Sequence, residues 1–201
     1  PLHPLARAAV NSLKPINTPL TSRISLVNKD LPKGRFLFVC ELWDFLGIQP
    51  DVRMVSLCWD VDQDEVNEQL SSRLIGLIGN CRDDGVNISE WGITIGKKYT
   101  QLDEARQIYR RDMLKRYIER NDFLMDRKIA SLNVWYRTRR QRLDIELPLV
   151  RDDRIRRMKD AELSNIERDY KQKRMDLETR KVADITTRRI AAGILEVKHG
   201  E

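Results

Sequence analysis

Apolar and polar positions alternate in three segments of the first half of the chain, which is the pattern of half-buried β-strands. Ile24 and Leu26 alternate with polar neighbours in the first segment. In the second, Phe36 and the next three alternate positions are apolar, and the third repeats this pattern from Val55 to Val61. Short turns separate the segments, so we expect an antiparallel meander.

A helix is predicted after the third strand, because apolar residues recur there every three or four positions. Asp62 or Asp64 is the expected N-cap of this helix. Residues 3–13 also have helical spacing, whereas residues 83–96 fit a loop or, at residues 92–96, a strand. The apolar stripe of the helix after the third strand consists of Val66, Leu70, Leu74 and Leu77.

The second half of the chain has the pattern of two long helices. Thr100 and Asp103 have the spacing of a capping box, and no glycine or proline follows before Pro148, so a helix of about 42 residues is predicted. Pro148 cannot continue that helix, and Asp152 or Asp153 can cap a second one of about 30 residues. Heptad-like apolar positions are Met125, Ile129, Leu132, Tyr136 and Leu143, interrupted at Arg139, and then Leu163, Ile166, Tyr170 and Leu177.

Two half-apolar helices with a short link are expected to pack as an antiparallel hairpin whose tip lies near Pro148. The final segment, RRIAAGILEVK, alternates and should form a strand. The sequence therefore predicts an α+β fold: a small antiparallel β-sheet with covering helices, a long coiled-coil-like hairpin, and a last strand that returns to the sheet. We expect residues 1–99 to form the sheet body, 100–187 the hairpin and 188–201 the closing strand.

Basic residues are concentrated on both sides of Pro148. The chain of 201 residues carries 37 Lys and Arg against 31 Asp and Glu, a net charge of +6. The helix dipole favours cations at the end of the first helix and disfavours them at the start of the second, so it explains only part of the cluster. Phosphate contact and an ordinary solvated surface both stay open. The candidate anion-binding residues are Arg137, Arg139, Arg140, Arg142, Arg151, Arg154, Arg156, Arg157 and Lys159.

Two aromatic residues, Trp135 and Tyr136, lie beside the basic cluster. Either ring could stack on nucleic-acid bases or bridge the two helices. Packing between the helices is the favoured role of Tyr136.

Patterns for enzymatic and metal chemistry are incomplete in this sequence. Residues 92–98, GITIGKK, have three residues between the glycines where a P-loop has four, and Lys98 replaces its Ser or Thr. The acidic run DVDQDE lacks the glycine and glutamate of a calcium loop, and the only histidines are His3 and His199. We therefore expect no cofactor, no metal and no catalytic residue, and we expect that this chain alone is not an enzyme.

Cysteine usage and hydropathy indicate the compartment. Cys40, Cys58 and Cys81 lie in apolar surroundings without CxxC spacing, which favours buried free thiols. No apolar run reaches the length of a membrane span, and the N-terminus lacks a signal-peptide pattern. A cytoplasmic protein without a membrane partner is expected.

Several segments, in this order, resemble a known family: HPLARAAV, LPKGRFLFVCELWDFLGIQPDVRMVSLCWD, LVRDDRIRRMKDAELSNIERDYKQKRMDLETR and RRIAAGILEV. Together they are similar to the region that follows the two motor lobes in bacterial Swi/Snf-type helicase-like ATPases, including relatives of the RNA-polymerase-associated helicase. The resemblance covers most of the chain. Walker A, DExH and arginine-finger motifs are absent, so the resemblance assigns no catalytic residue here.

The resemblance implies that the chain is a C-terminal accessory module of a larger ATP-driven motor acting on DNA or RNA. Implied partners are the motor lobes of that parent protein, a nucleic-acid backbone and RNA polymerase. An alternative is a coiled-coil module for protein–protein interaction or oligomerisation, although basic residues at seam positions argue against long self-association. A free-standing enzyme is the third reading, but no set of convergent polar groups supports it.

Overall fold

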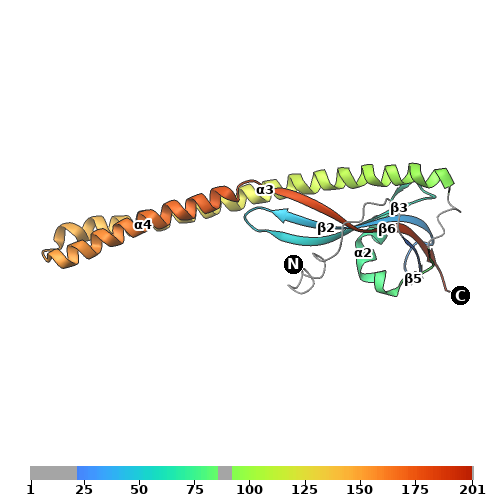
Figure 1. Cartoon of the computed structure of the whole chain (residues 1–201), viewed down its shortest axis with the longest axis horizontal. Coiled ribbons are helices and arrows are strands. Elements are labelled where there is room, and N and C mark those ends of the chain that lie inside the picture. Colours follow the sequence, from blue (N-terminus) through green and yellow to red (C-terminus); the bar gives the residue numbers. More distant parts are fainter. Residues whose placement is uncertain (1–21, 86–91, 201) are drawn as a thin grey trace. The chain divides into compact units, whose positions relative to one another are not determined.

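The computed structural model describes residues 22–85 and 92–200 of the chain. Their elements form an α+β fold with a six-stranded mixed sheet, a short helix, and a long helix that packs against a second one (Figure 1). The chain divides into two compact units: residues 1–45, 51–113 and 185–201 form unit 1, and residues 46–50 and 114–184 form unit 2. The helix predicted in residues 3–13 lies outside the described residues.

The sheet contains six strands in the spatial order β4-β3-β2-β6-β1-β5. The strands are β1 (Ser22–Val27), β2 (Gly34–Leu46), β3 (Asp51–Asp60), β4 (Glu65–Val66), β5 (Arg82–Asp83) and β6 (Asp184–Lys198). The three expected strands and the returning last strand are confirmed, and β2 and β3 pair antiparallel as predicted. The meander is wrong, because β6 lies between β2 and β1 and pairs with β1 in parallel.

Because the returning strand β6 pairs with β1 in parallel, the sheet is mixed and not antiparallel as predicted. Six residues of β1 pair with β6, from Ser22 opposite Gly193 to Val27 opposite Lys198. An ideal Cβ at Gly193 would lie 2.1 Å from the carbonyl oxygen of Ser22, so only glycine fits at this crossing of the two strands. Because the partners are distant in sequence, local periodicity did not reveal this pairing.

Both faces of strand β2 are buried. Phe36, Phe38 and Cys40 point to one apolar cluster, which also contains Leu70 and Leu74 of helix α2 (Glu68–Leu77). The helix predicted after the third strand is thus confirmed and covers one face of the sheet. Its N-cap is Asn67, whose side chain accepts a hydrogen bond from the Leu70 N–H, rather than Asp62 or Asp64.

The other face of β2 packs against the beginning of helix α3 (Gly92–Glu146). Leu37 and Val39 share a cluster with Ile95 and Leu102 of this helix. The prediction of a start at Thr100, with loop or strand at residues 92–96, is therefore wrong. Burial of an apolar face outweighs the low helix propensity of Gly92 and Gly96.

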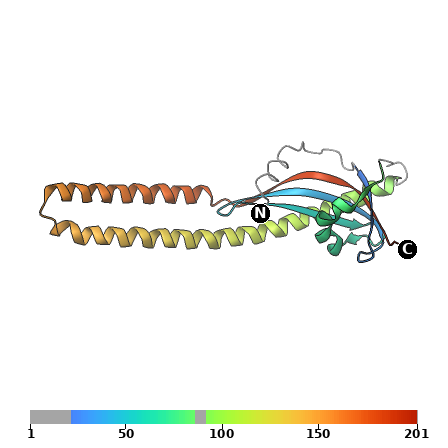
Figure 2. The ribbon, with the colours of Figure 1, turned by 90° about the horizontal axis from the view of Figure 1, so that it is seen from below.

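Unit 2 contains the hairpin, and its tip lies where the sequence predicted it. Helix α3 ends at Glu146, the short 3₁₀ turn η3 (Leu147–Leu149) contains Pro148, and helix α4 (Asp153–Thr179) follows. Asp152 is the N-cap, and its carboxylate accepts hydrogen bonds from the Arg154 and Ile155 N–H groups. Figures 1 and 2 show α3 and α4 side by side and antiparallel.

The seam of the hairpin is formed by the predicted apolar positions. Met125, Leu143 and Ile166 are at most 4% exposed. Tyr136 stacks on Tyr170 with ring centroids 4.4 Å apart, so the packing role favoured for Tyr136 is confirmed.

At the other end of unit 2, the buried Asn121 side chain joins two further segments to α3. Its Oδ1 accepts a hydrogen bond from the Ile48 N–H at 2.8 Å, and its Nδ2 donates to the Lys181 carbonyl at 3.0 Å. Gly47 has no room for a side chain, because an added Cβ would lie 2.5 Å from Asn121 Oδ1. The turn between β2 and β3 is therefore fixed to the helix.

Candidate nucleic-acid interface

The nine candidate cations lie at one end of the hairpin, on both sides of η3. Four are on α3, Arg151 is in the link, and four are on the first two turns of α4. We refer to this set as the basic tip: Arg137, Arg139, Arg140, Arg142, Arg151, Arg154, Arg156, Arg157 and Lys159.

Three members of the basic tip have carboxylate partners on the facing helix. Arg142 lies 2.9 Å from Glu162, Arg140 lies 3.5 Å from Glu167, and Lys159 donates to Glu146. Arg140 and Arg142 also contact carboxylates one turn further along α3, at longer distances. These ion pairs join α3 to α4, so the carboxylates nearest to the three cations already have partners.

The other six cations of the basic tip have no ion pair among the residues described by the structure. All six are exposed, so their guanidinium groups are accessible to a ligand. Arg139 is placed over the ring of Trp135, with its Cζ 5.3 Å from the ring centroid. The set consists of Arg137, Arg139, Arg151, Arg154, Arg156 and Arg157.

The local structure explains why α4 can begin with so many cations. The Asp152 side chain accepts hydrogen bonds from backbone N–H groups at the N-cap. The Asp153 carboxylate lies in the first turn, where the helix dipole favours negative charge. The arginines that follow are repelled by the helix dipole and gain nothing from it. An anionic ligand would relieve this repulsion.

Trp135, unlike its neighbour Tyr136, borders an open groove between α3 and α4. Lys173 Nζ lies 4.5 Å from its ring centroid. The groove has a volume of about 460 Å³, and its lining also includes Lys128 and Arg180. Trp135 could be identified from the sequence, but these three cations could not, because the register between the two helices decides which residues face the ring.

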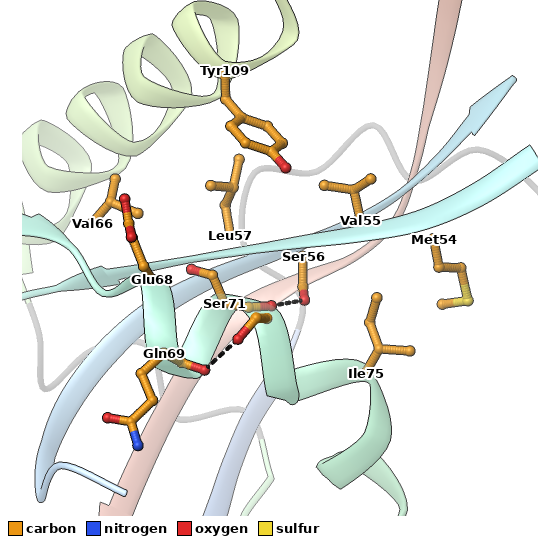
Figure 3. A pocket seen from close by; sticks show the side chains of 11 residues that line it. Met54, Val55, Ser56, Leu57, Val66, Glu68, Gln69, Ser71, Ile75 and Tyr109 are labelled. Atoms are coloured by element: carbon orange, nitrogen blue, oxygen red, sulfur yellow. Dashed lines mark hydrogen bonds between the residues drawn. The ribbon is translucent and has the colours of Figure 1, made fainter. Parts of the chain in front are cut away.

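A second hollow lies in unit 1, between β3, α2 and Tyr109 of α3 (Figure 3). Its volume is about 670 Å³. The serine hydroxyl groups that line it bind neighbouring backbone: Ser56 donates to the Ser71 carbonyl, and Ser71 Oγ accepts from the Cys58 N–H. These groups stabilise the packing of α2 on β3 and present no convergent set to a ligand.

The cysteines are free thiols, as expected. Cys40 and Cys58 are buried and Cys81 is half-buried. Burial raises the pKa of Cys40 to about 12 and raises that of Cys58 as well, so neither is a reactive thiolate near neutral pH.

Within residues 22–85 and 92–200, no three His, Cys, Asp or Glu side chains are grouped so that they could hold a metal ion. No helix in the same part of the chain combines the length and the apolar character that crossing a membrane requires.

Models of known protein families give no match to this chain, and a search of curated proteins finds no significant match either.

Proposed function

We propose that the chain is a non-catalytic accessory module that contacts a nucleic-acid backbone through the basic tip. The observation that carries the proposal is the set of six exposed tip arginines without an ion pair in the described structure. The hairpin brings them together from two helices and the link. An excess of exposed cations over carboxylates at one end of a hairpin is the electrostatic pattern of a polyanion-binding surface.

Arginine suits this contact because its planar guanidinium binds phosphate oxygens with two hydrogen bonds. Contacts to the backbone position a protein without reading the base sequence. Each neutralised phosphate releases condensed counterions, so the affinity should fall steeply with salt.

The resemblance noted in the sequence supports placing this module in a larger bacterial Swi/Snf-type ATP-dependent helicase or translocase. ATP binding and hydrolysis would then belong to the motor lobes of that parent protein. The motor lobes would be its permanent partner, DNA or RNA its substrate, and RNA polymerase a further candidate partner.

A second candidate function is supported by apolar side chains at the tip. Ile145, Leu149 and Met158 are 69%, 76% and 63% exposed, and they lie among the arginines. Exposed apolar residues of this size favour a protein contact. In this alternative the hairpin is a coiled-coil interaction or oligomerisation module with no nucleic-acid role.

The test is binding of the whole chain to a short labelled duplex and to a labelled single strand over a salt series. The variant replaces Arg137, Arg151, Arg156 and Arg157 by Gln. Each lost phosphate contact should reduce the slope of log affinity against log salt by roughly 0.9 for a duplex, so the variant should lose up to about 3.6.

The matched control removes the same charge from exposed positions of unit 1, with Lys29, Lys33, Arg73 and Arg82 replaced by Gln. It should keep the slope of the unmodified chain. An equal loss of slope in both variants would mean that net charge, not the tip, drives binding. A folded chain that binds neither probe at low salt, and that light scattering shows to be a stable dimer, would favour the interaction module.

A further inference from the structure

The groove beside Trp135 lies within unit 2, between the second half of α3 and the second half of α4. Its apolar lining comes from Trp135, Leu132 and Leu177. Trp135 is seven residues before Arg142 of the basic tip, which corresponds to about 10 Å along the helix. A nucleic-acid strand bound at the basic tip could therefore continue into this groove.

The charge of the groove is strongly positive. Lys128, Lys173 and Arg180 line it, and none of them has an ion pair with a described residue. The one carboxylate in the lining is that of Asp176, which accepts a hydrogen bond from Gln172 at 2.9 Å. An anionic ligand thus meets three cations and one carboxylate, so the lining keeps a net positive charge.

The ring of Trp135 provides a flat apolar surface next to these cations. Lys173 Nζ at 4.5 Å and Arg139 Cζ at 5.3 Å lie over it. Both side chains are long and exposed, so either can move aside for a planar group. A displaced ammonium or guanidinium would still reach a phosphate attached to that group.

We propose that this Trp135 groove holds one base of a single-stranded nucleic acid, stacked on the indole, with the flanking phosphates on Lys128, Lys173 and Arg180. The inference rests on the proposed function of the basic tip and extends it. The tip holds the backbone of either form of nucleic acid, whereas the groove requires a base that is free to leave its stack. The module should then prefer single strands to duplexes of equal charge.

The experiment compares two labelled strands of equal length, one with normal bases and one abasic, so that their phosphates are matched. The whole chain should bind the strand with bases roughly tenfold more tightly, as expected for one stacked base. Trp135→Leu should abolish this preference while it leaves the salt slope unchanged. Trp135→Phe should restore part of the preference, and circular dichroism should show that both variants are folded.

Phe123→Leu is the matched control, because Phe123 is an exposed aromatic on the same helix with Arg127 over its ring at 5.7 Å, and it does not line the groove. This control should keep the base preference. Tryptophan fluorescence should be quenched by the strand with bases and not by the abasic one, and Trp135→Phe should remove that quenching.

The outcomes separate the groove from the tip. Salt-dependent binding with equal affinity for the two strands, or a preference that survives in Trp135→Leu, overturns the groove and leaves the tip standing. Absence of binding to any strand or duplex overturns both.

Discussion

Glu41 is a carboxylate in the interior of unit 1, with only 3% of its surface exposed. Its Oε1 accepts a hydrogen bond from Arg106 at 2.8 Å, and its Oε2 accepts one from the Trp43 indole N–H at 3.0 Å. Arg189 Nε lies 4.0 Å away, an ion-pair distance too long for a hydrogen bond. Burial opposes the charge of Arg106, but Glu41 and Asp103 outweigh it, so the pKa of Arg106 lies above its usual range.

Glu41→Gln should destabilise the protein, because it removes the negative charge that faces two largely buried guanidinium groups. The loss should be about 3 kcal/mol in the free energy of unfolding, near the lower end for a broken buried pair. Urea unfolding followed by tryptophan fluorescence measures it. Glu104→Gln, an exposed neighbour on α3, should change the free energy by less than about 0.5 kcal/mol.

At the scale of elements, the hairpin end is held by ion pairs rather than by a large apolar core. Glu146 and Lys159 lie in the last turn of α3 and the second turn of α4. The hydrogen bond and the charge of Lys159 hold the pKa of Glu146 below its ordinary value of 4.5. Hairpin stability should therefore depend on the protonation of this carboxyl group.

The sign of the pH dependence follows from the lowered pKa. Because the folded value lies below the unfolded one, the contribution is complete above pH 4.5 and disappears as the pH falls through the folded value. Lys159→Met should therefore lower the melting temperature at pH 7, and this difference from the unmodified chain should shrink below pH 4.5. Thermal melts followed by circular dichroism at a series of pH values measure the difference.

Arg151→Met is the control for this comparison, because Arg151 is exposed and has no ion pair with a described residue. Its melting temperature should differ from that of the unmodified chain by the same small amount at every pH. A difference for Lys159→Met that stays constant down to pH 3 would contradict the role of Glu146.

Elements with a strong local pattern were predictable from the sequence, and those decided by distant contacts were not. The period of apolar residues revealed β2, β3 and both long helices, and Pro148 marked the tip. The start of α3 at Gly92 was missed because glycine disfavours helices and the burial of Ile95 is a tertiary effect. The parallel pairing of β1 with β6 has no local signal.

The same distinction applies to the candidate interface. The basic tip could be predicted because its cations flank one proline and a hairpin necessarily brings them together. The Trp135 groove could not, because Lys173 and Arg180 face Trp135 only in one register of α3 against α4. That register is set by contacts such as the stacking of Tyr136 on Tyr170, which heptad spacing alone does not define.

At the scale of the whole chain, the sheet depends on the pairing of two strands, β1 and β6, that are far apart in the sequence. Ser22 and Gly193 are opposite each other in the β1–β6 pair, and the backbones approach so closely that a Cβ at Gly193 would meet the Ser22 carbonyl. Sheet formation therefore depends on glycine at this position.

Gly193→Ala should destabilise the protein by about 2 kcal/mol or more, because backbone atoms must move to admit the methyl group. The same substitution at Gly76, in the last turn of α2, should have the opposite sign, since nothing lies within 4 Å of an added Cβ there. Alanine there should stabilise the helix by up to about 1 kcal/mol. Urea midpoints of the two variants test the pair, and a stable Gly193→Ala would contradict the close approach of β1 and β6.

The position of β6 between β2 and β1 also has a consequence for biosynthesis. Strand β1 is synthesised well before its parallel partner, which begins only at Asp184. At a synthesis rate of roughly 5–20 residues per second, β1 and the edge of β2 that pairs with β6 stay unpaired for about 10–30 s. During that interval these edges are open to other chains, so the nascent protein should depend on chaperones until its last strand has been made.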